Sequence, residues 1–509
     1  MSELTLDTLM DEGGYGDRAR TENQALLDEL ERKKKARSMA VPTDDGRVRA
    51  RLREMGEPIT LFGERPADRR DRLIYVLSQI NAARGDVSPA IESESNLDGE
   101  EETVEEFYTP GSIELLEARR RIAEFSLPRS QAQKRVAQQR IESKMPLRRL
   151  IDIRKRVFSE VKSFSNMGSQ IGDKRPISMV RFSPNSQVLA TGSWSGGVKL
   201  WNIPSLTPLR TLRGHEDRIG GLAWHPQATL SQSEGTVNLV SGAGDFNLHL
   251  WSLNSDAPLA TLRGHEGRVC RTVFHPSGNY VASASFDTSW RLWDVSTQKE
   301  LLLQEGHSRE VYSIDIQGDG ALIASGGLDA IGRVWDLRTG RTAMVLDGHV
   351  QGIFTIAFSP NGYQIATGAG DDTIRIWDMR SLKALYTIPA HRSNVSDIRF
   401  FRCADLPTLM TQDVKMKEPV SSDDISGDNP LDDTVDAEQD KRYRSGLYFA
   451  SAGYDGLVKL WSADDWQLLR TLTTDAGKVM SIDLSEDSKY LVSGTYNRNF
   501  QLYEPEGSV

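Results

Sequence analysis

The stretch HPSGNYVASASFDTSWRLWD, residues 275–294, holds the pattern that decides the fold. A turn sequence, HPSGN, precedes a short run of β-branched and small residues and an aromatic closing pair, so the run is predicted to be a strand between tight turns. The closing pair recurs, and several neighbours stand 42 residues apart, which is the period of a propeller blade. The seven pairs are Trp201-Asn202, Trp251-Ser252, Trp293-Asp294, Trp335-Asp336, Trp377-Asp378, Trp461-Ser462 and Tyr503-Glu504.

Seven closing pairs predict a mainly β protein, a seven-bladed β-propeller over residues 159–509. Only six residues follow Tyr503, too few for the outer strand of the last blade. An unpaired sheet edge favours aggregation, so that strand is expected from residues 160–171, just before the first repeat.

Three further positions recur with each closing aromatic. A hydroxyl residue precedes it by ten positions, an aspartate usually precedes it by six, and a Gly-His or Ala-His pair lies upstream. With these markers the units resemble WD repeats, and the resemblance implies one buried hydrogen-bond chain per blade. Ser195 and Asn497 replace the aspartate in the outermost units. The implied chains involve His215, His265, His307, His349, His391, Asp245, Asp287, Asp329, Asp371, Asp455, Trp201, Trp251, Trp293, Trp335, Trp377 and Trp461.

Histidine, aspartate and serine recurring together could be mistaken for a catalytic triad. The set appears once per blade, which an active site would not do, so a structural role is predicted. The sequence also lacks the GxxxxGK[ST], HExxH and GxSxG motifs, and no enzymatic activity, cofactor or metal is expected. The two cysteines, Cys270 and Cys403, are too few for a disulfide framework.

Two intervals are longer than the repeat. The first contains ATLSQSEGT, a predicted surface loop, and the second, from Trp377 to Trp461, could hide an eighth blade. The second has no further closing aromatic, and its stretch SSDDISGDNPLDDTVDAEQD is acidic and poor in apolar residues. A disordered insertion at about 404–445, between the first two strands of one blade, is therefore predicted.

The region before the repeats is charged and predicted to be mostly helical. An N-terminal arm, 1–42, contains a helix that ends in Lys33, Lys34, Lys35 and Arg37, either a nuclear import signal or a solvated helix face. Residues 43–90 follow, with a helix over 47–55 ended by Gly56 and Pro58, and a second helix from Pro66. An acidic linker, 91–111, comes next.

The sequence GEPITLFGE, residues 56–64, with the arginine-rich RRDRL at 69–73, resembles the splicing-factor motif of pre-mRNA processing factors. Ahead of a WD-repeat array it resembles the U4/U6 small nuclear ribonucleoprotein family. The resemblance implies a nuclear scaffold in U4/U6 and the U4/U6.U5 tri-snRNP that binds U4 and U6 RNA, other processing factors, U5 particle proteins and a nuclear cyclophilin. The motif residues are Gly56, Glu57, Pro58, Leu61, Phe62, Gly63, Glu64, Arg69, Arg70 and Arg72.

A basic helical arm, 112–158, is predicted before the propeller. Between Arg119 and Lys162 there are 14 Lys or Arg against four acids, although the whole chain carries a net charge of −10. Such clusters suit phosphate contact, whereas a protein-binding or solvated helix is the alternative. The clusters contain no aromatic residue, so duplex or structured RNA is favoured over stacked single strands. The candidate contacts are Arg119, Arg120, Arg121, Arg148, Arg149, Arg154, Lys155 and Arg156.

A second function remains open from the sequence. The tetrapeptides at 335–338 and 377–380 resemble the WDxR pattern of substrate receptors in cullin-RING ubiquitin ligases, where the arginine contacts the adaptor. No apolar run approaches the ~18 residues of a membrane span, and the N-terminus is acidic rather than signal-like. No membrane association is expected, and the protein is predicted to be cytosolic or nuclear.

Overall fold

The computed structural model describes residues 45–58, 66–83, 111–142, 147–403, 444–474 and 477–506. The chain divides into two units, residues 1–110 and 111–509, which are considered separately. The N-terminal helix and its basic cluster, the acidic linker and the predicted insertion lie outside the described residues, apart from residue 111 of the linker and 444–445 of the insertion. No helix in the described part is long and apolar enough to cross a membrane.

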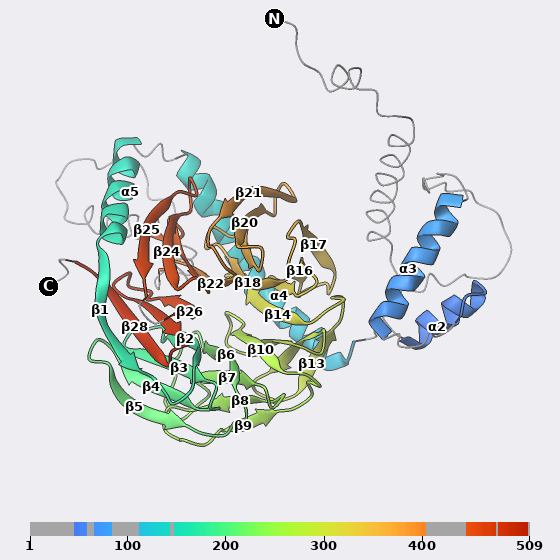
Figure 1. Ribbon diagram of the computed structural model, residues 1–509, viewed down its shortest axis with the longest axis horizontal. Coiled ribbons are helices and arrows are strands. Elements are labelled where there is room, and N and C mark those ends of the chain that lie inside the picture. Colours follow the sequence, from blue (N-terminus) through green and yellow to red (C-terminus); the bar gives the residue numbers. More distant parts are fainter. Residues whose placement is uncertain are drawn as a thin grey trace, which may run out of the picture. The chain divides into compact units, whose positions relative to one another are not determined.

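The repeats form seven four-stranded antiparallel sheets among the described residues, which confirms the seven-bladed propeller (Figure 1). Each closing aromatic lies near the end of the third strand of its blade, so a sequence repeat ends one strand before the blade does. Blades 1 to 4 consist of β2 (Ile177–Phe182), β3 (Val188–Ser193), β4 (Val198–Asn202), β5 (Thr207–Leu212), β6 (Ile219–Trp224), β7 (Leu239–Ala243), β8 (Leu248–Trp251), β9 (Ala260–Leu262), β10 (Val269–Phe274), β11 (Tyr280–Ser285), β12 (Trp290–Asp294), β13 (Glu300–Gln304), β14 (Val311–Ile316), β15 (Leu322–Gly327), β16 (Ile331–Asp336) and β17 (Thr342–Asp347).

Blades 5 and 6 follow the same order, and residues 404–443, outside the described part of the chain, fall between β22 and β23, the first two strands of blade 6. The long interval thus belongs to one blade, as predicted. These strands are β18 (Ile353–Phe358), β19 (Gln364–Ala369), β20 (Thr373–Asp378), β21 (Lys383–Pro389), β22 (Val395–Phe400), β23 (Tyr448–Gly453), β24 (Leu457–Ser462) and β25 (Leu468–Thr473).

Blade 7 is closed by a strand from the other end of the propeller. Its sheet order is β1-β28-β27-β26, from β26 (Val479–Leu484), β27 (Leu491–Thr495), β28 (Asn499–Pro505) and β1 (Phe164–Ile171). β1 pairs with β28 along its whole length, from Phe164 opposite Pro505 to Ile171 opposite Asn499. The prediction that the segment before the first repeat supplies this strand is confirmed. In the described ring, β1 covers the edge of β28, which would otherwise be unpaired.

Apolar residues of adjacent blades form the core. One cluster joins blades 6 and 7 through Tyr448, Leu460 and Tyr503, and similar clusters lie between the other neighbouring sheets. Because each sheet packs on the next, the ring is one continuous framework. Its innermost strands line a central channel, and the turns at either end form two faces.

Two helices precede the ring in the same unit, α4 (Ile113–Glu142) and α5 (Leu147–Lys162). The N-terminal unit contains α2 (Asp45–Glu54) and α3 (Pro66–Ala83), close to the predicted helices. α5 extends four residues beyond the predicted end at 158, because Val161 still packs into the core of blades 6 and 7.

Candidate nucleic-acid and partner interface

The helix α4 lies across one face of the propeller, formed by the turns after the first and third strands of each blade (Figure 1). Leu115, Ala118 and Ile122 are buried against blades 3 and 4. Lys299 of blade 3 pairs with Glu114 at 2.8 Å, and the Phe125 ring lies 5.5 Å from the His275 ring. One apolar stripe therefore fixes the helix on this face, here named the α4 face.

The three predicted cations at the start of α4 have different surroundings. The Arg119 guanidinium fills the space that a side chain at Gly340 would occupy, so it faces the propeller. Arg121 is exposed and lies 3.7 Å from Glu117, a weak surface pair. Arg120 is exposed. Within this cluster, Arg120 and Arg121 are accessible to a partner while α4 stays docked on the propeller.

The helix α5 divides into a buried face and a charged face. Ile153, Val157 and Val161 pack into the core of blades 6 and 7. Arg154 pairs with Asp465 at 2.6 Å, and Arg444 donates to Glu160 at 2.8 Å. Both pairs join the helix to blade 6, so Arg154 has a structural contact within the chain.

The remaining cations of α5 lie on its outer side. Arg148, Lys155 and Arg156 are exposed, and Arg149 is half-buried. We name four exposed cations the outer basic set: Arg120 of α4 and Arg148, Lys155 and Arg156 of α5. Their exposure is compatible with phosphate contact.

Aromatic residues do occur within the basic segment, contrary to the prediction that none accompany its charges. Arg129 lies over the Phe125 ring at 3.9 Å, and Arg154 lies over Phe158 at 5.0 Å. Burial lowers the pKa of Arg129. Because each ring already carries a guanidinium and is half-buried, neither offers an open face for a base.

The splicing-factor motif lies in the N-terminal unit, where α2 and α3 pack together. Val48, Leu52 and Leu73 are buried between them, and Arg69 is 4% exposed. Gly56 has a φ of +75° and ends α2, with Glu57 N–H donating to the Leu52 carbonyl at 3.0 Å. Gly56, Glu57, Pro58, Arg69, Arg70 and Arg72 are described, whereas Leu61, Phe62, Gly63 and Glu64 lie outside the described residues.

Five blades contain the complete predicted hydrogen-bond chain. In blade 3, Trp293 Nε1 donates to Ser283 Oγ at 2.8 Å, and the two ring nitrogens of His265 contact Ser283 at 2.6 Å and Asp287 at 2.7 Å. His215, His307, His349 and His391 make the same contacts with Asp245, Asp329, Asp371 and Asp455. The chains are repeated and fully buried at the histidine, which fits a structural role.

Blades 1 and 7 have other polar contacts in place of this hydrogen-bond chain. In blade 1, Asp173 stands where the other blades have the marker histidine, and it accepts from Ser195 and pairs with Lys199 at 3.2 Å. Burial raises the pKa of Asp173, but the hydrogen bonds from Ser193 and Ser195 outweigh it and bring the pKa to about 2. In blade 7, the Tyr503 hydroxyl lies 3.3 Å from Ser493 Oγ. The sequence prediction recognised the substituted aspartates but not Asp173.

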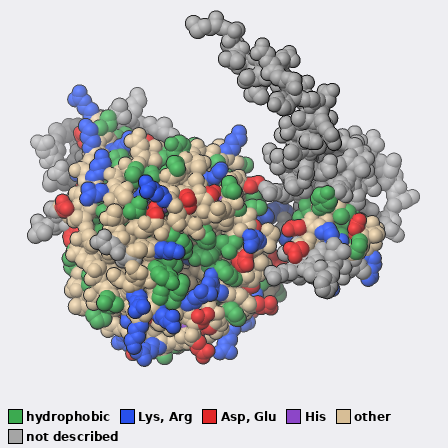
Figure 2. Space-filling model, in the orientation of Figure 1, with side chains coloured by type: hydrophobic (Ala, Val, Ile, Leu, Met, Phe, Trp, Pro, Cys, Tyr) green, Lys and Arg blue, Asp and Glu red, His purple; other side chains and the backbone are tan. Residues whose placement is uncertain are grey.

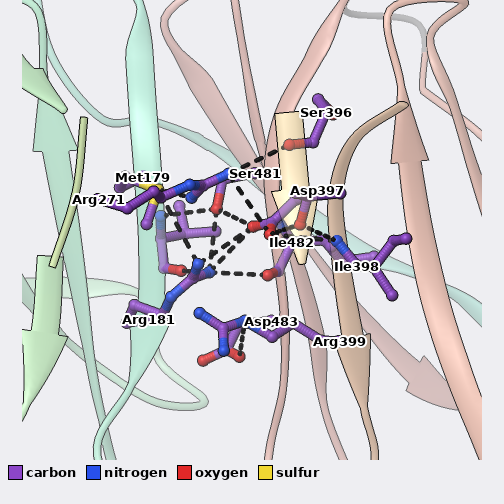
Figure 3. Close-up of polar contacts among 12 residues, drawn as sticks. Met179, Arg181, Arg271, Ser396, Asp397, Ile398, Arg399, Ser481, Ile482 and Asp483 are labelled. Carbon is purple, nitrogen blue, oxygen red and sulfur yellow. Dashed lines mark hydrogen bonds and ion pairs between the residues drawn. The ribbon is translucent and has the colours of Figure 1, made fainter. Parts of the chain in front are cut away.

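Charged side chains also meet across the central channel (Figure 3). Both terminal nitrogens of Arg181, from blade 1, donate to Asp397 of blade 6 at 3.2 Å, and Ser481 of blade 7 donates to the same carboxylate at 2.8 Å. Arg271 of blade 3 lies 3.5 Å from Asp397. The network joins four blades through one buried acid.

The charges of this network depend on one another. Burial raises the pKa of Asp397, but Arg271, Arg181 and Arg399 outweigh it and hold the pKa well below its ordinary value. Burial lowers the pKa of Arg181 to about 10. The carboxylate and its arginines therefore remain ionised at neutral pH. These residues could not be recognised in the sequence, because the third and fifth positions of the innermost strands, which they occupy, hold different residue types from blade to blade.

The two WDxR arginines lie on the α4 face. Arg338 donates to Asp336 at 3.1 Å through two nitrogens, and Arg380 contacts Asp378 at 2.9 Å and lies over the Tyr363 ring at 3.7 Å. Each arginine thus has a partner two residues earlier in its own turn. Local structure accounts for the pattern without a ligase adaptor.

Comparison with known proteins links the motif to the repeats. The family model described as pre-mRNA processing factor 4 (PRP4) like matches residues 48–76, and the WD domain, G-beta repeat, model matches 164–202, 206–252, 256–294, 298–336, 340–378 and 466–504. The U4/U6 small nuclear ribonucleoprotein Prp4 of Mus musculus is 43% identical over 224 residues, which are 44% of this chain and 42% of the relative. The chain is thus similar to Prp4-like WD-repeat proteins in both its motif and its repeats.

Two further proteins are similar to this chain. The U4/U6 small nuclear ribonucleoprotein PRP4 of Saccharomyces cerevisiae is 34% identical over 227 residues, covering 41% of this chain and 45% of the relative. An uncharacterized WD repeat-containing protein of Schizosaccharomyces pombe is 41% identical over 271 residues, covering 52% and 56%. The chain thus spans about half or less of the length of these relatives.

One repeat of the family pattern has no match to the repeat model. The interval between residues 378 and 466 is unmatched, yet the structure places blade 6 there. Residues 404–443 separate its first strand from its second, which breaks the spacing on which repeat recognition depends.

Proposed function

We propose that this chain is a non-enzymatic scaffold subunit of the nuclear U4/U6 small nuclear ribonucleoprotein and of the U4/U6.U5 tri-snRNP in pre-mRNA splicing. The observation that carries the proposal is the PRP4-like motif ahead of a seven-bladed ring. Relatives that match this chain are named as U4/U6 small nuclear ribonucleoprotein proteins. Rigid rings of this kind offer several binding surfaces without chemistry of their own.

The outer basic set supports RNA contact by this scaffold. Its four cations project from helices that are fixed on the ring by Ile122, Ile153 and Val157. Because the helices are already fixed on the ring, less conformational entropy is lost when their cations bind phosphates. U4 and U6 RNA are the proposed ligands of this set.

The helical pair α2–α3 is proposed to bind other U4/U6-bound processing factors. It forms a unit with its own small core and a partly exposed apolar surface that includes Tyr75, which is 50% exposed. Contacts with U5 particle proteins and a nuclear cyclophilin are proposed on the family resemblance alone.

The test is purification of the tagged full chain from nuclear extract, with the bound RNA sequenced and the bound proteins identified across a salt series. Replacing the four residues of the outer basic set by Gln should weaken recovery of U4 and U6. It should also flatten the salt dependence, by about 0.9 in log–log slope for each phosphate that the variant no longer neutralises. A matched control replaces four exposed cations on outer parts of the propeller by Gln, at Arg213, Arg263, Lys383 and Arg470.

The two parts of the scaffold can be separated in the same experiment. Leu73→Asp places a charge between α2 and α3 and should remove the processing factors while the RNA signal of the outer basic set persists. Absence of U4 and U6 at low salt would contradict the proposal. Recovery of a cullin adaptor in their place would favour the ubiquitin-ligase alternative.

A further inference from the structure

The face opposite α4 carries a regular arrangement of aromatic and basic residues around the mouth of the central channel. Figure 2 shows this face, here named the open face, with hydrophobic side chains gathered near its middle and Lys and Arg side chains beside them. The loops that enter the first strand of each blade, and the turns that follow the second strand, form this face.

One backbone hydrogen bond repeats in all seven blades and fixes these side chains. The residue after the second strand donates its N–H to the carbonyl of the residue before the first strand, at 2.8–3.0 Å. Two rings of equivalent positions therefore surround the channel. The pairs are Trp194 with Pro176, Gly244 with Arg218, Phe286 with Arg268, Leu328 with Glu310, Gly370 with Gly352, Tyr454 with Asn394 and Tyr496 with Lys478.

Aromatic and basic residues are concentrated at these positions in one sector. Arg218 lies over the Trp194 ring at 5.9 Å, Arg268 over Phe286 at 4.0 Å, and Lys478 over Tyr454 at 5.4 Å. Two of these contacts join neighbouring blades, 1 with 2 and 6 with 7, and the third lies within blade 3. With Tyr312 and Phe354, which lie in the first strands of blades 4 and 5, these residues are here named the mouth ring; it consists of Trp194, Arg218, Arg268, Phe286, Tyr312, Phe354, Tyr454, Lys478 and Tyr496.

Further ring contacts extend this surface. Trp194 meets Tyr496 edge to face at 5.6 Å, and Tyr312 meets Phe354 in the same way at 5.2 Å. Tyr496 is 44% exposed, which leaves part of its ring open to solvent. An aromatic held by its neighbours and open on one side can stack with a planar ligand.

A small cavity of about 60 Å³ opens within the mouth ring. Arg218, Arg268 and Arg271 line it together with Trp194 and Tyr312, and no carboxylate is among its lining residues. Among the residues that the structure describes, none supplies a carboxylate that pairs with Arg218 or Arg268 within 4.0 Å. The nearby acids Asp217 and Glu266 are exposed and lie outside the lining. The cavity is therefore suited to an anionic group of small size.

The thiol in this cavity adds no covalent chemistry. Burial raises the pKa of Cys270 to about 11, so the group remains protonated at neutral pH. A neutral thiol is a poor nucleophile. The cavity is thus a binding feature.

A second depression lies beside it on the open face, with a volume of about 550 Å³. Leu328, Val350 and Phe354 contribute apolar surface, whereas Arg309 and Asp329 contribute one cation and one acid. The Tyr312–Phe354 contact connects the two depressions. A ligand that extends across both would meet the arginines of the small cavity first, then the Tyr312–Phe354 pair and the largely apolar second depression.

We propose that the mouth ring binds single-stranded RNA, with phosphates at Arg218 and Arg268 and a base stacked on the exposed ring of Tyr496. Cations that follow a backbone, alternating with aromatic faces for bases, are the features by which proteins hold unpaired strands. An acidic peptide would satisfy the arginines, but it offers the rings a planar group only where it carries an aromatic side chain, whereas every nucleotide carries a base. This site differs from the outer basic set in position and ligand, because it is on the opposite face and prefers unpaired RNA.

The experiment uses the full chain with the outer basic set replaced by Gln, and measures its binding to a fluorescein-labelled RNA octamer of mixed sequence by anisotropy, with a duplex of the same sequence alongside. The single strand should bind more tightly than the duplex. Tyr496→Leu, which keeps an apolar side chain but removes the ring, should weaken single-strand binding about tenfold. Tyr496→Phe should bind as the chain without this substitution does, because the stacking face is retained.

Charge is tested separately. Replacing Arg218 and Arg268 together by Gln should lower the log–log salt slope by about 1.4, since each phosphate contact on a single strand contributes about 0.7. Lys489→Gln, an exposed cation in a turn of the α4 face, is the matched control and should leave the slope unchanged. Equal thermal unfolding midpoints would establish that the variants are folded.

Two results would overturn the site. One is equal or weaker affinity for the single strand than for the duplex; the other is unchanged octamer affinity in the Tyr496→Leu and double Gln variants. Both can be obtained whether or not the chain recovers U4 and U6 from extract, so failure here is distinguishable from failure of the scaffold proposal.

Discussion

Asp397 of blade 6 accepts hydrogen bonds from both terminal nitrogens of Arg181 in blade 1, across the central channel, at 3.2 Å. The two residues are separated by 216 positions in the chain, so this contact exists only when the ring has closed. The side chain of Arg181 is 7% exposed and that of Asp397 is 3% exposed. A buried pair of this kind makes conformations that separate the two charges costly, because either charge alone would be buried without a partner.

Removing the acid should therefore destabilise the ring strongly. Asp397→Ala leaves Arg181 and Arg271 buried without their carboxylate and is expected to cost about 3–5 kcal/mol in unfolding free energy. Urea denaturation followed by tryptophan fluorescence measures the change. Asp465→Ala, which removes a half-exposed acid paired with Arg154, serves as the control and should cost about 0–1 kcal/mol. Equal effects of the two substitutions would contradict the special role of the channel network.

Closure by β1 leads to a second prediction. A chain that begins at residue 172 lacks the strand that covers β28, whereas one that begins at residue 147 keeps α5 and β1. The shorter chain should aggregate, because the β28 edge offers unpaired backbone groups to other molecules. Size-exclusion chromatography after refolding distinguishes them. A monomeric, folded shorter chain would show that the seventh sheet does not need its fourth strand.

The repeat unit and the ring closure could be predicted because their signals are local or follow from counting. The distance of ten residues from Ser283 to Trp293 is set by one hairpin, and the same spacing appears in each unit. The pairing of β1 with β28 agrees with the strand expected from residues 160–171. Asp173 was missed because its partner chemistry, an acid in the place of a histidine, departs from the family pattern.

The channel network and the mouth ring could not be predicted in the same way. Arg181 and Asp397 meet only through the geometry of the closed ring, and their spacing along the chain carries no periodic signal. The aromatic residues Trp194 and Tyr496 are neighbours because blades 7 and 1 are adjacent, although they lie at opposite ends of the propeller sequence. Tertiary closure, rather than local propensity, brings these groups together.

Docking of α4 is predicted to depend on its apolar stripe and not on its charges. Ile122 is 1% exposed, so Ile122→Asp should release the helix from blades 3 and 4 and make it sensitive to trypsin at its many arginines. Leu116→Asp is the matched control, since Leu116 is 51% exposed on the same helix. Limited proteolysis with mass spectrometry locates the cuts. If Ile122→Asp leaves the helix as resistant as the control does, the packing described for α4 is wrong.

The hydrogen-bond chains make stability depend on pH in a defined direction. Burial raises the pKa of Asp287, but hydrogen bonds from His265 and Ser289 and the charge of His265 outweigh it and bring the pKa to about 2, below its ordinary value of 3.8. Because the folded pKa is depressed, the carboxylate stabilises the fold fully above the unfolded value and loses that contribution as pH falls from about 4 toward 2.

Asp287→Asn should thus cost about 1.5–3 kcal/mol at neutral pH, the range for hydrogen bonds to a charged group. The difference in unfolding free energy between the unaltered chain and Asp287→Asn should remain constant above about pH 5 and shrink below it. Urea titrations at a series of pH values check this. If this difference in unfolding free energy stayed constant below the unfolded pKa of Asp287, the hydrogen bond with His265 would not stabilise the ionised carboxylate. In that case the repeated chain would stabilise each blade through its neutral hydrogen bonds from Trp293 and Ser283 alone.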